Sequence, residues 1–151
     1  MRLSGFDYTS PGAYFVTVCA SRRGSVFGCV RDGAVRLNAC GLVVSEALDA
    51  ITDHHAVQVD TSVVMPDHVH AIVVIARDPR PETLSAVVGA FKARVSRQVR
   101  RPVWKRSFYD HVIRDDKDLD RVREYIETNP IRWSLRERPE GWGPDRSGPY
   151  G

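Results

Sequence analysis

The stretch that decides the fold reads Met65-Pro66-Asp67-His68-Val69-His70-Ala71-Ile72-Val73-Val74-Ile75. Pro66 and Asp67 favour a tight turn, because proline presets φ and aspartate tolerates the next turn position. The apolar run after them predicts a strand. Successive strand side chains alternate between faces, so His68 and His70 project from one side, about 7 Å apart, and Asp67 falls on the other. Two such imidazoles can bind a metal ion, although half-exposed strand histidines without a ligand give the same pattern.

Three more segments predict strands around this one. Residues 57–63 alternate valine and threonine with polar side chains, so the histidine strand returns antiparallel beside them. Residues 13–19 are β-branched and aromatic, and their continuous apolarity predicts an internal strand. Residues 26–30 and 34–37 predict a small hairpin inserted beside the main sheet, because Asp32-Gly33 adopts positive φ at little cost.

Three helices and one further strand complete the pattern. The helices are expected over residues 39–53 after an Asn38 cap, from Pro81-Glu82 onward, and from an Asp115 or Asp116 cap to Asn129 before Pro130. The further strand is expected over residues 107–113. Without the hairpin and the last helix the order is β-α-β-β-α-β, which predicts an α+β, ferredoxin-like fold with a four-stranded antiparallel sheet and helices on one face.

Composition predicts one soluble domain. The 151 residues are 42% hydrophobic and 27% charged, which supplies enough apolar material for a core. We expect a domain over residues 1–133 and a Pro/Gly-rich tail over 134–151. The N-terminal residues lack an apolar signal segment, and no stretch approaches the roughly 20 apolar residues of a membrane helix, so we expect a cytoplasmic protein without membrane contact. Three scattered cysteines without a CxxC pair indicate neither a disulfide framework nor a zinc finger.

Positive charge is concentrated in the middle of the chain. Residues 76–111 carry 9 of the 22 Lys and Arg residues but only 3 of the 19 acidic ones. Arg94, Arg97 and Arg101 follow each other at spacings of three and four, so they form a stripe on one helical face. A stripe of this kind suits a phosphate backbone, although a solvated basic helix face has the same composition.

The last predicted helix carries Tyr125 and Asn129, which are four residues apart. They stack on one face of the helix, at the edge of its apolar stripe. We therefore expect both side chains to be partly covered and directed at the sheet margin. A packing tyrosine and an ordinary helix-ending asparagine before proline would look the same.

Three segments together resemble the single-tyrosine HUH transposases, and in particular the REP-associated tyrosine transposases of bacteria. They are residues 65–70 (MPDHVH), 104–114 (WKRSFYDHVIR) and 123–130 (REYIETNP). Residues 14–19 and 26–28 also fit, so the resemblance covers about Pro11 to Trp133. Asp67 stands where many members have asparagine.

The resemblance implies a site and a reaction. His68, His70 and Asn129 would bind Mg²⁺ or Mn²⁺, and Tyr125 would attack a DNA phosphodiester to leave a 5′-phosphotyrosine and a free 3′-OH. The substrate would be single-stranded DNA beside a hairpin, cut and rejoined in DNA transposition by a monomer or homodimer. The rival nucleophile Tyr109 lies on a predicted strand and has no asparagine at helical spacing.

The same resemblance gives the basic residues a role. Lys92, Lys105 and Arg106 join the arginine stripe of Arg94, Arg97 and Arg101 as candidates for binding the DNA backbone, and Trp104 or Trp142 could stack on a base or pack in the core. Two alternatives remain. One is a non-catalytic ferredoxin-like protein that binds single-stranded nucleic acid, and the other is a metal-dependent phosphoesterase that uses water.

Overall fold

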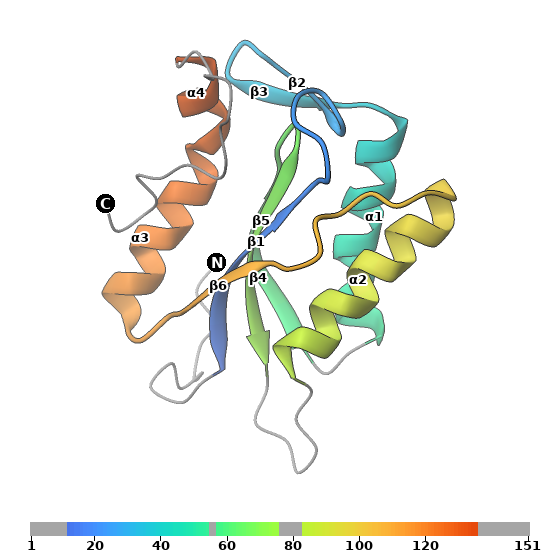
Figure 1. Ribbon diagram of the computed structural model, residues 1–151. Coiled ribbons are helices and arrows are strands. Elements are labelled where there is room, and N and C mark those ends of the chain that lie inside the picture. The colour runs from blue at the N-terminus through green and yellow to red at the C-terminus, as the bar shows by residue number, and fades with distance from the viewer. Residues whose placement is uncertain (1–11, 55–56, 76–82, 136–151) are drawn as a thin grey trace.

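The computed structural model describes residues 12–54, 57–75 and 83–135 (Figure 1). The main sheet contains the strands β1 (Ala13–Cys19), β4 (Val57–Val64), β5 (His68–Ile75) and β6 (Tyr109–Val112). A separate two-stranded hairpin contains β2 (Gly28–Arg31) and β3 (Ala34–Leu37). The helices are α1 (Ala39–His54), α2 (Leu84–Val99), α3 (Asp116–Glu127) and α4 (Asn129–Ser134).

The main sheet has the predicted ferredoxin-like topology. Its strand order is β4-β5-β1-β6, and every neighbouring pair is antiparallel. The histidine strand β5 lies between two partners and is buried along its whole length. In the described part of the chain no helix is long and apolar enough to cross a membrane.

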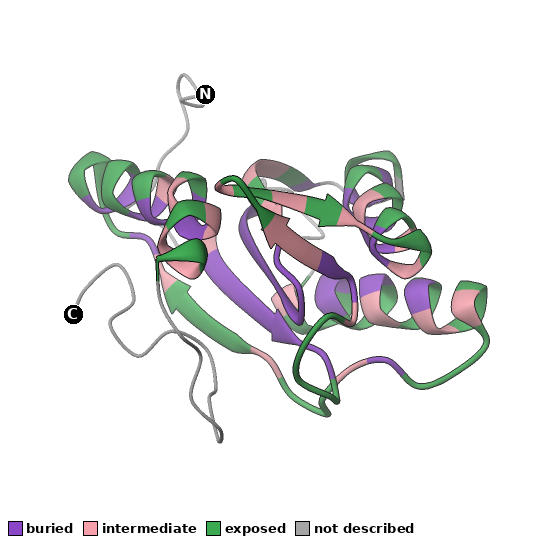
Figure 2. Ribbon diagram, turned by 90° about the horizontal axis from the view of Figure 1, so that it is seen from above, coloured by how far each residue is buried: buried purple, intermediate pink, exposed green. Residues whose placement is uncertain are grey.

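Helices cover both faces of the sheet (Figure 1). α1 and α2 pack on the face that carries Val69, Ala71 and Val73, whereas α3 packs on the opposite face, against Phe15 and Ile72. Each helix is buried toward the sheet and exposed on its outer side (Figure 2). The two helices of the predicted β-α-β-β-α-β unit, α1 and α2, lie on one face as expected, and the last predicted helix lies on the other. Because β5 is apolar on both faces, the second face also needs a cover, and α3 supplies it.

Several local signals act as predicted. Asn38 Oδ1 accepts a hydrogen bond from the Gly41 backbone N–H at the start of α1. Asp32 and Gly33 both have positive φ in the hairpin turn. Thr83 caps α2, so that helix begins later than predicted, and Pro81 and Glu82 lie outside the described residues.

The regular alternation predicted for residues 57–63 is broken. A β-bulge lies between Val59 and Ser62, where Asp60 and Thr61 together oppose the stretch of β5 between Val73 and Ala71. After the bulge Val63 pairs with His70 and faces α3, although Val57 and Val59 face α1 and α2. The bulge therefore reverses the sheet face toward which the odd-numbered residues of β4 point.

The last helix ends before Pro130, as predicted, but a second short helix follows at once. Thr128 is both the C-cap of α3 and the N-cap of α4, and Pro130 occupies the first turn of α4. Sequence reasoning did not predict α4. Residues 136–151 of the predicted tail, including Trp142, lie outside the described part of the chain.

Candidate metal and nucleophile site

The two strand histidines converge on one point. The Nε2 atoms of His68 and His70 are 3.1 Å apart, and their ring centroids are 4.6 Å apart. Two cis ligands on one ion at about 2.1 Å are separated by about 3 Å, so the spacing suits a shared cation. Both side chains face the layer occupied by α3, and each is only 1% exposed. The alternative that these are half-exposed strand histidines is therefore wrong.

Each imidazole is held through its other nitrogen. Nδ1 of His70 lies 2.9 Å from the hydroxyl of Thr17, its partner on β1. Nδ1 of His68 lies 2.9 Å from Oδ1 of Asp67, and the Gly24 backbone N–H donates to Oδ2 of the same carboxylate. Hydrogen bonds of this kind orient metal-binding histidines. The expectation that Asp67 points away from the imidazoles is wrong, because Asp67 lies in the turn before the strand, where faces do not alternate.

Tyr125 lies directly over the histidine face of the sheet. Its ring centroid is 5.5 Å from that of His70 and 5.8 Å from that of Phe15. The side chain is 4% exposed, so it is buried over the sheet face and not partly covered at the margin as predicted. Arg132 from α4 also contacts it, with its guanidinium over the ring, 4.0 Å from the ring centroid, and a hydrogen bond to the Tyr125 carbonyl.

Asn129 lies one helical turn beyond Tyr125 and is 2% exposed. Trp133, one further turn along the chain, has its ring centroid 6.0 Å from that of His68. The residues before and after Asn129 on this helical face therefore contact the two histidines. In the described residues no cluster of three His, Cys, Asp or Glu side chains could hold a metal. Among the described residues, the Asn129 amide is a candidate for a further ligand at the histidine pair, beside phosphate oxygens of a substrate or water.

A buried ion pair ties α3 to the sheet. Arg123 donates from Nε and Nη2 to the two oxygens of Asp60 at 2.8 and 2.6 Å, and the Asp60 side chain is fully buried. Burial raises the pKa of Asp60, but hydrogen bonds from Arg123 and Thr61 and the charge of Arg123 outweigh it, so the net pKa lies below the usual value. Asp60 sits in the β4 bulge, and Arg123 precedes Tyr125 by two residues.

The predicted basic stripe is not at this site. Arg94 and Arg97 line a groove between α1 and α2, on the layer opposite the histidines, and Arg101 lies beyond the end of α2. Lys92 donates to the carbonyls of Lys105 and Arg106, and burial lowers its pKa. Lys92 therefore supports the segment before β6.

Lys105 and Arg106 lie at the histidine end of the sheet. The Lys105 backbone N–H donates to the carbonyl of Cys19, which is the β1 partner of His68. The Trp104 ring packs at centroid distances of 5.2 Å from Phe27 and 5.4 Å from Phe91, so it is a core residue. The structure thus places the segment that carries two of the six predicted basic residues beside the end of β1 that pairs with His68.

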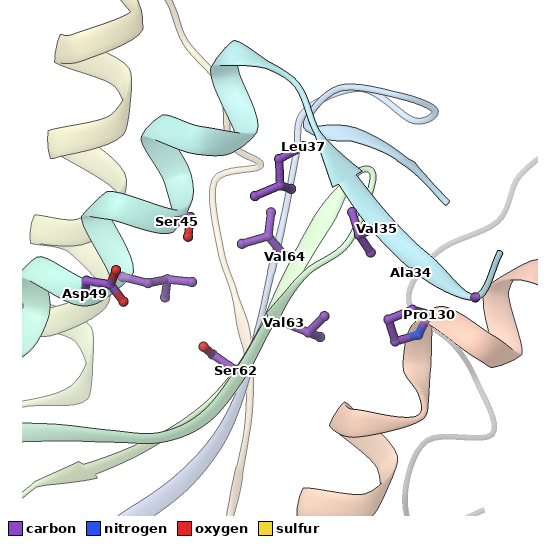
Figure 3. Close-up of a pocket in the computed structure, with 11 residues that line it drawn as sticks. Ala34, Val35, Leu37, Ser45, Asp49, Ser62, Val63, Val64 and Pro130 are labelled. Carbon is purple, nitrogen blue, oxygen red and sulfur yellow. The ribbon is translucent and has the colours of Figure 1, made fainter. Parts of the chain in front are cut away.

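A pocket of about 350 Å³ borders the site at the edge of the sheet (Figure 3). It lies between α1, β3, β4 and α4. Val63, the cross-strand partner of His70, and Pro130, which follows Asn129, both line it. Open space therefore lies beside Pro130, the residue that follows the candidate third ligand.

The family model described as IS200-like transposase matches residues 14–129, which span the main sheet from the second residue of β1 onward and include His68, His70, Tyr125 and Asn129. The chain belongs to this transposase family. An uncharacterized protein of Haemophilus influenzae is 30% identical to this transposase and covers 88% of both chains. A second Haemophilus influenzae protein, provisionally named a REP-associated tyrosine transposase, is 22% identical over 90% of this chain and 80% of its own.

Two solved structures share the fold of this transposase. The structure of a REP-associated tyrosine transposase bound to a REP hairpin has a TM-score of 0.69 at 21% identity, covering 94% of this chain and 80% of that one. A provisionally named transposase from Deinococcus radiodurans has a TM-score of 0.53 at 17% identity, covering 84% and 95%. The predicted family and fold class are confirmed.

Sequence reasoning missed four residues that organise the site: Thr17, Asp60, Arg123 and Arg132. A sequence signal for Arg123 exists, because this residue belongs to the segment REYIETNP, two residues before Tyr125. Thr17 and Asp60 carry no signal of their own. Their roles depend on strand register and on a bulge that the sequence pattern does not show.

Proposed function

We propose that this transposase is a metal-dependent endonuclease and strand transferase for single-stranded DNA, with Tyr125 as its nucleophile. The observation that carries the proposal is the contact of the Tyr125 ring with His70, beside two histidine Nε2 atoms 3.1 Å apart. His68 and His70, with Asn129, would hold a divalent cation such as Mg²⁺ or Mn²⁺. When bound, the cation would neutralise and orient a phosphodiester, which otherwise repels a nucleophile.

The proposed reaction exchanges one phosphoester bond for another. The phenol oxygen of Tyr125 forms a bond to phosphorus, and the bond from phosphorus to the 3′ oxygen breaks. The phenol loses one proton, and the 3′ oxygen takes up one proton and leaves as a 3′-OH. The product is a 5′-phosphotyrosine that another 3′-OH resolves, joining the strands. Because the histidine strand and the tyrosine helix pack together within one chain, we propose that a single chain supplies the whole site, in a monomer or in each subunit of a homodimer.

The proposed substrate is a DNA hairpin with a single-stranded flank. The family assignment and the shared fold with a transposase bound to a REP hairpin support this choice. Lys105 and Arg106 are the basic residues that we expect beside the bound strand, because their segment pairs with the histidine end of β1.

The test is covalent capture of DNA on the full chain. The protein is incubated with Mg²⁺ or Mn²⁺ and a library of hairpins labelled at the 3′ end, since a 5′-phosphotyrosine retains the 3′ fragment. We expect a labelled protein band that disappears with Tyr125→Phe and persists with Tyr109→Phe, whose tyrosine is 58% exposed on the edge strand.

Three outcomes would overturn the proposal. A band that persists in Tyr125→Phe would remove the tyrosine assignment. Metal-dependent nicks without a band would indicate a phosphoesterase that uses water. Salt-sensitive DNA binding with neither nicks nor a band would indicate a non-catalytic binding protein.

A further inference from the structure

The hydrogen bonds around the histidine pair differ in a way that fixes where protons lie. Asp67 and Thr17 occupy equivalent places, each 2.9 Å from an imidazole Nδ1. An ionised carboxylate only accepts hydrogen bonds, whereas a hydroxyl both donates and accepts. The two histidines therefore face partners of different capability.

Asp67 determines the tautomer of His68. The carboxylate is buried and is held by the Gly24 backbone N–H at its other oxygen, so Oδ1 faces His68 as an acceptor. Nδ1 of His68 must then carry the proton, and Nε2 of His68 keeps its lone pair. This is the tautomer that a metal ion requires at Nε2.

Without a cation, the same logic fixes His70. Its Nε2 lies 3.1 Å from the Nε2 lone pair of His68, and two lone pairs at this distance repel each other. With both rings neutral, Nε2 of His70 must carry a proton and donate it to His68. Nδ1 of His70 then has a lone pair and accepts a hydrogen bond from the Thr17 hydroxyl.

A bound cation requires a different tautomer at His70. Both Nε2 atoms must then direct lone pairs at the ion, so the His70 proton has to lie on Nδ1, where it is donated to the Thr17 oxygen. The proton relocates within one ring and the net charge of the protein does not change. Only a partner that can donate in one state and accept in the other satisfies both arrangements.

We propose that His68 is a fixed ligand locked by Asp67, and that His70 is a switching ligand whose tautomer change is accommodated by Thr17. Asp67 and Thr17 are positioning residues, because they act through the histidines. This inference rests on the proposed metal site. Its first part concerns the protein without metal and can be tested separately.

The first experiment observes the tautomers directly. The full chain is labelled with ¹⁵N-histidine, and long-range ¹H–¹⁵N spectra are recorded near pH 8, where free imidazole is neutral. We expect His68 to carry its proton on Nδ1 and His70 on Nε2. Diamagnetic Zn²⁺ should move the His70 proton to Nδ1 and leave His68 unchanged.

Two results would overturn the inference at different levels. A proton on Nδ1 of His70 before metal is added would remove the switch but leave the proposed metal site intact. Failure of Zn²⁺ to change either ring would remove the metal site together with the switch.

The second experiment tests the partners by calorimetric titration with Mn²⁺. Thr17→Val keeps the shape of the side chain but loses the hydroxyl, and Asp67→Asn introduces an amide that can donate to His68. We expect each to weaken Mn²⁺ binding by about 10- to 100-fold, the range typical of such outer partners. Asp67→Asn should also give mixed tautomers at His68.

Matched variants separate these roles from a general effect on folding. Thr17→Ser retains a hydroxyl and should restore Mn²⁺ affinity and the His70 switch. Ser62→Ala removes an exposed hydroxyl that faces the other side of the sheet, and should change neither. Unchanged Mn²⁺ affinity in Thr17→Val, or loss of affinity in Thr17→Ser equal to that in Thr17→Val, would contradict the role of the hydroxyl.

Discussion

The two halves of the candidate site are held in place by different means. The histidine half lies on a central strand, with backbone hydrogen bonds on both sides and a polar partner at each Nδ1. The tyrosine half lies on α3 and α4, which contact the sheet through side chains: apolar packing, the Asp60–Arg123 ion pair and the ring contacts of Tyr125 and Trp133.

This difference separates binding from chemistry. Two of the three proposed metal ligands, His68 and His70, and the partners that orient them lie on the sheet side, so metal binding should depend mainly on residues of this half. The helix half depends on the packing of Leu119, Val122 and Ile126 against the sheet and on the Asp60–Arg123 ion pair. Variants can therefore separate the two functions, with expected effects that range from complete loss of metal binding to a small change in salt dependence.

The largest effect should come from removing the imidazoles. His68→Ala and His70→Ala should abolish both Mn²⁺ binding and covalent DNA capture, because no cluster of three His, Cys, Asp or Glu side chains among the described residues could replace them. Tyr125→Phe should abolish capture but retain Mn²⁺ binding, as measured by calorimetry. Loss of Mn²⁺ binding in Tyr125→Phe would show that the two halves do not function separately.

A large effect on stability should come from the ion pair between the halves. Arg123→Met leaves the Asp60 carboxylate buried and unpaired, which should lower the free energy of unfolding by roughly 3–5 kcal/mol in urea titrations. The double variant Asp60→Leu/Arg123→Met removes both charges and should recover most of this loss. A double variant that is no more stable than Arg123→Met would contradict this assignment.

The same pair should give a smaller, pH-dependent effect. The folded-state pKa of Asp60 is below its usual value of 3.8, so the unfolded chain binds a proton more readily. The contribution of Asp60 is therefore fully present above about pH 4 and is lost as pH falls through the folded pKa. The stability difference between the unchanged protein and Asp60→Asn should narrow below pH 3.8 in urea titrations at several pH values. A difference that widens on acidification would contradict the sign of the shift.

The smallest effect should come from exposed basic residues, whose position relative to the site decides the outcome. Lys105→Ala/Arg106→Ala should weaken hairpin binding. It should also reduce the slope of log affinity against log salt concentration by about 1.4, because each phosphate contact on a single strand contributes roughly 0.7 to this slope. Arg94→Ala/Arg97→Ala removes the same charge from the opposite layer and should change the slope less. The reverse ranking would place the DNA across α1 and α2.

Sequence reasoning predicted what depends on neighbours along the chain. The turn at Pro66-Asp67, the Asn38 cap and the spacing from Tyr125 to Asn129 are local patterns, and the family resemblance linked the two halves of the site. It failed where the answer depends on three-dimensional neighbours. The face covered by α3, the contact of Asp67 with His68 and the distance of Arg94 from the site all follow from packing that no short pattern records.

The bulge in β4 shows that one additional residue in a strand can determine how a helix is attached to the sheet. A straight strand would place one side chain opposite Ile72, and the bulge places Asp60 and Thr61 there. Deletion of one of these residues would restore the two-residue repeat and remove either the carboxylate that binds Arg123 or the hydroxyl that supports it. A single-codon deletion at this point would leave the two histidine ligands untouched and yet release the helix that carries the nucleophile. Among relatives of this transposase, the length of β4 should therefore vary together with the residue at position 123.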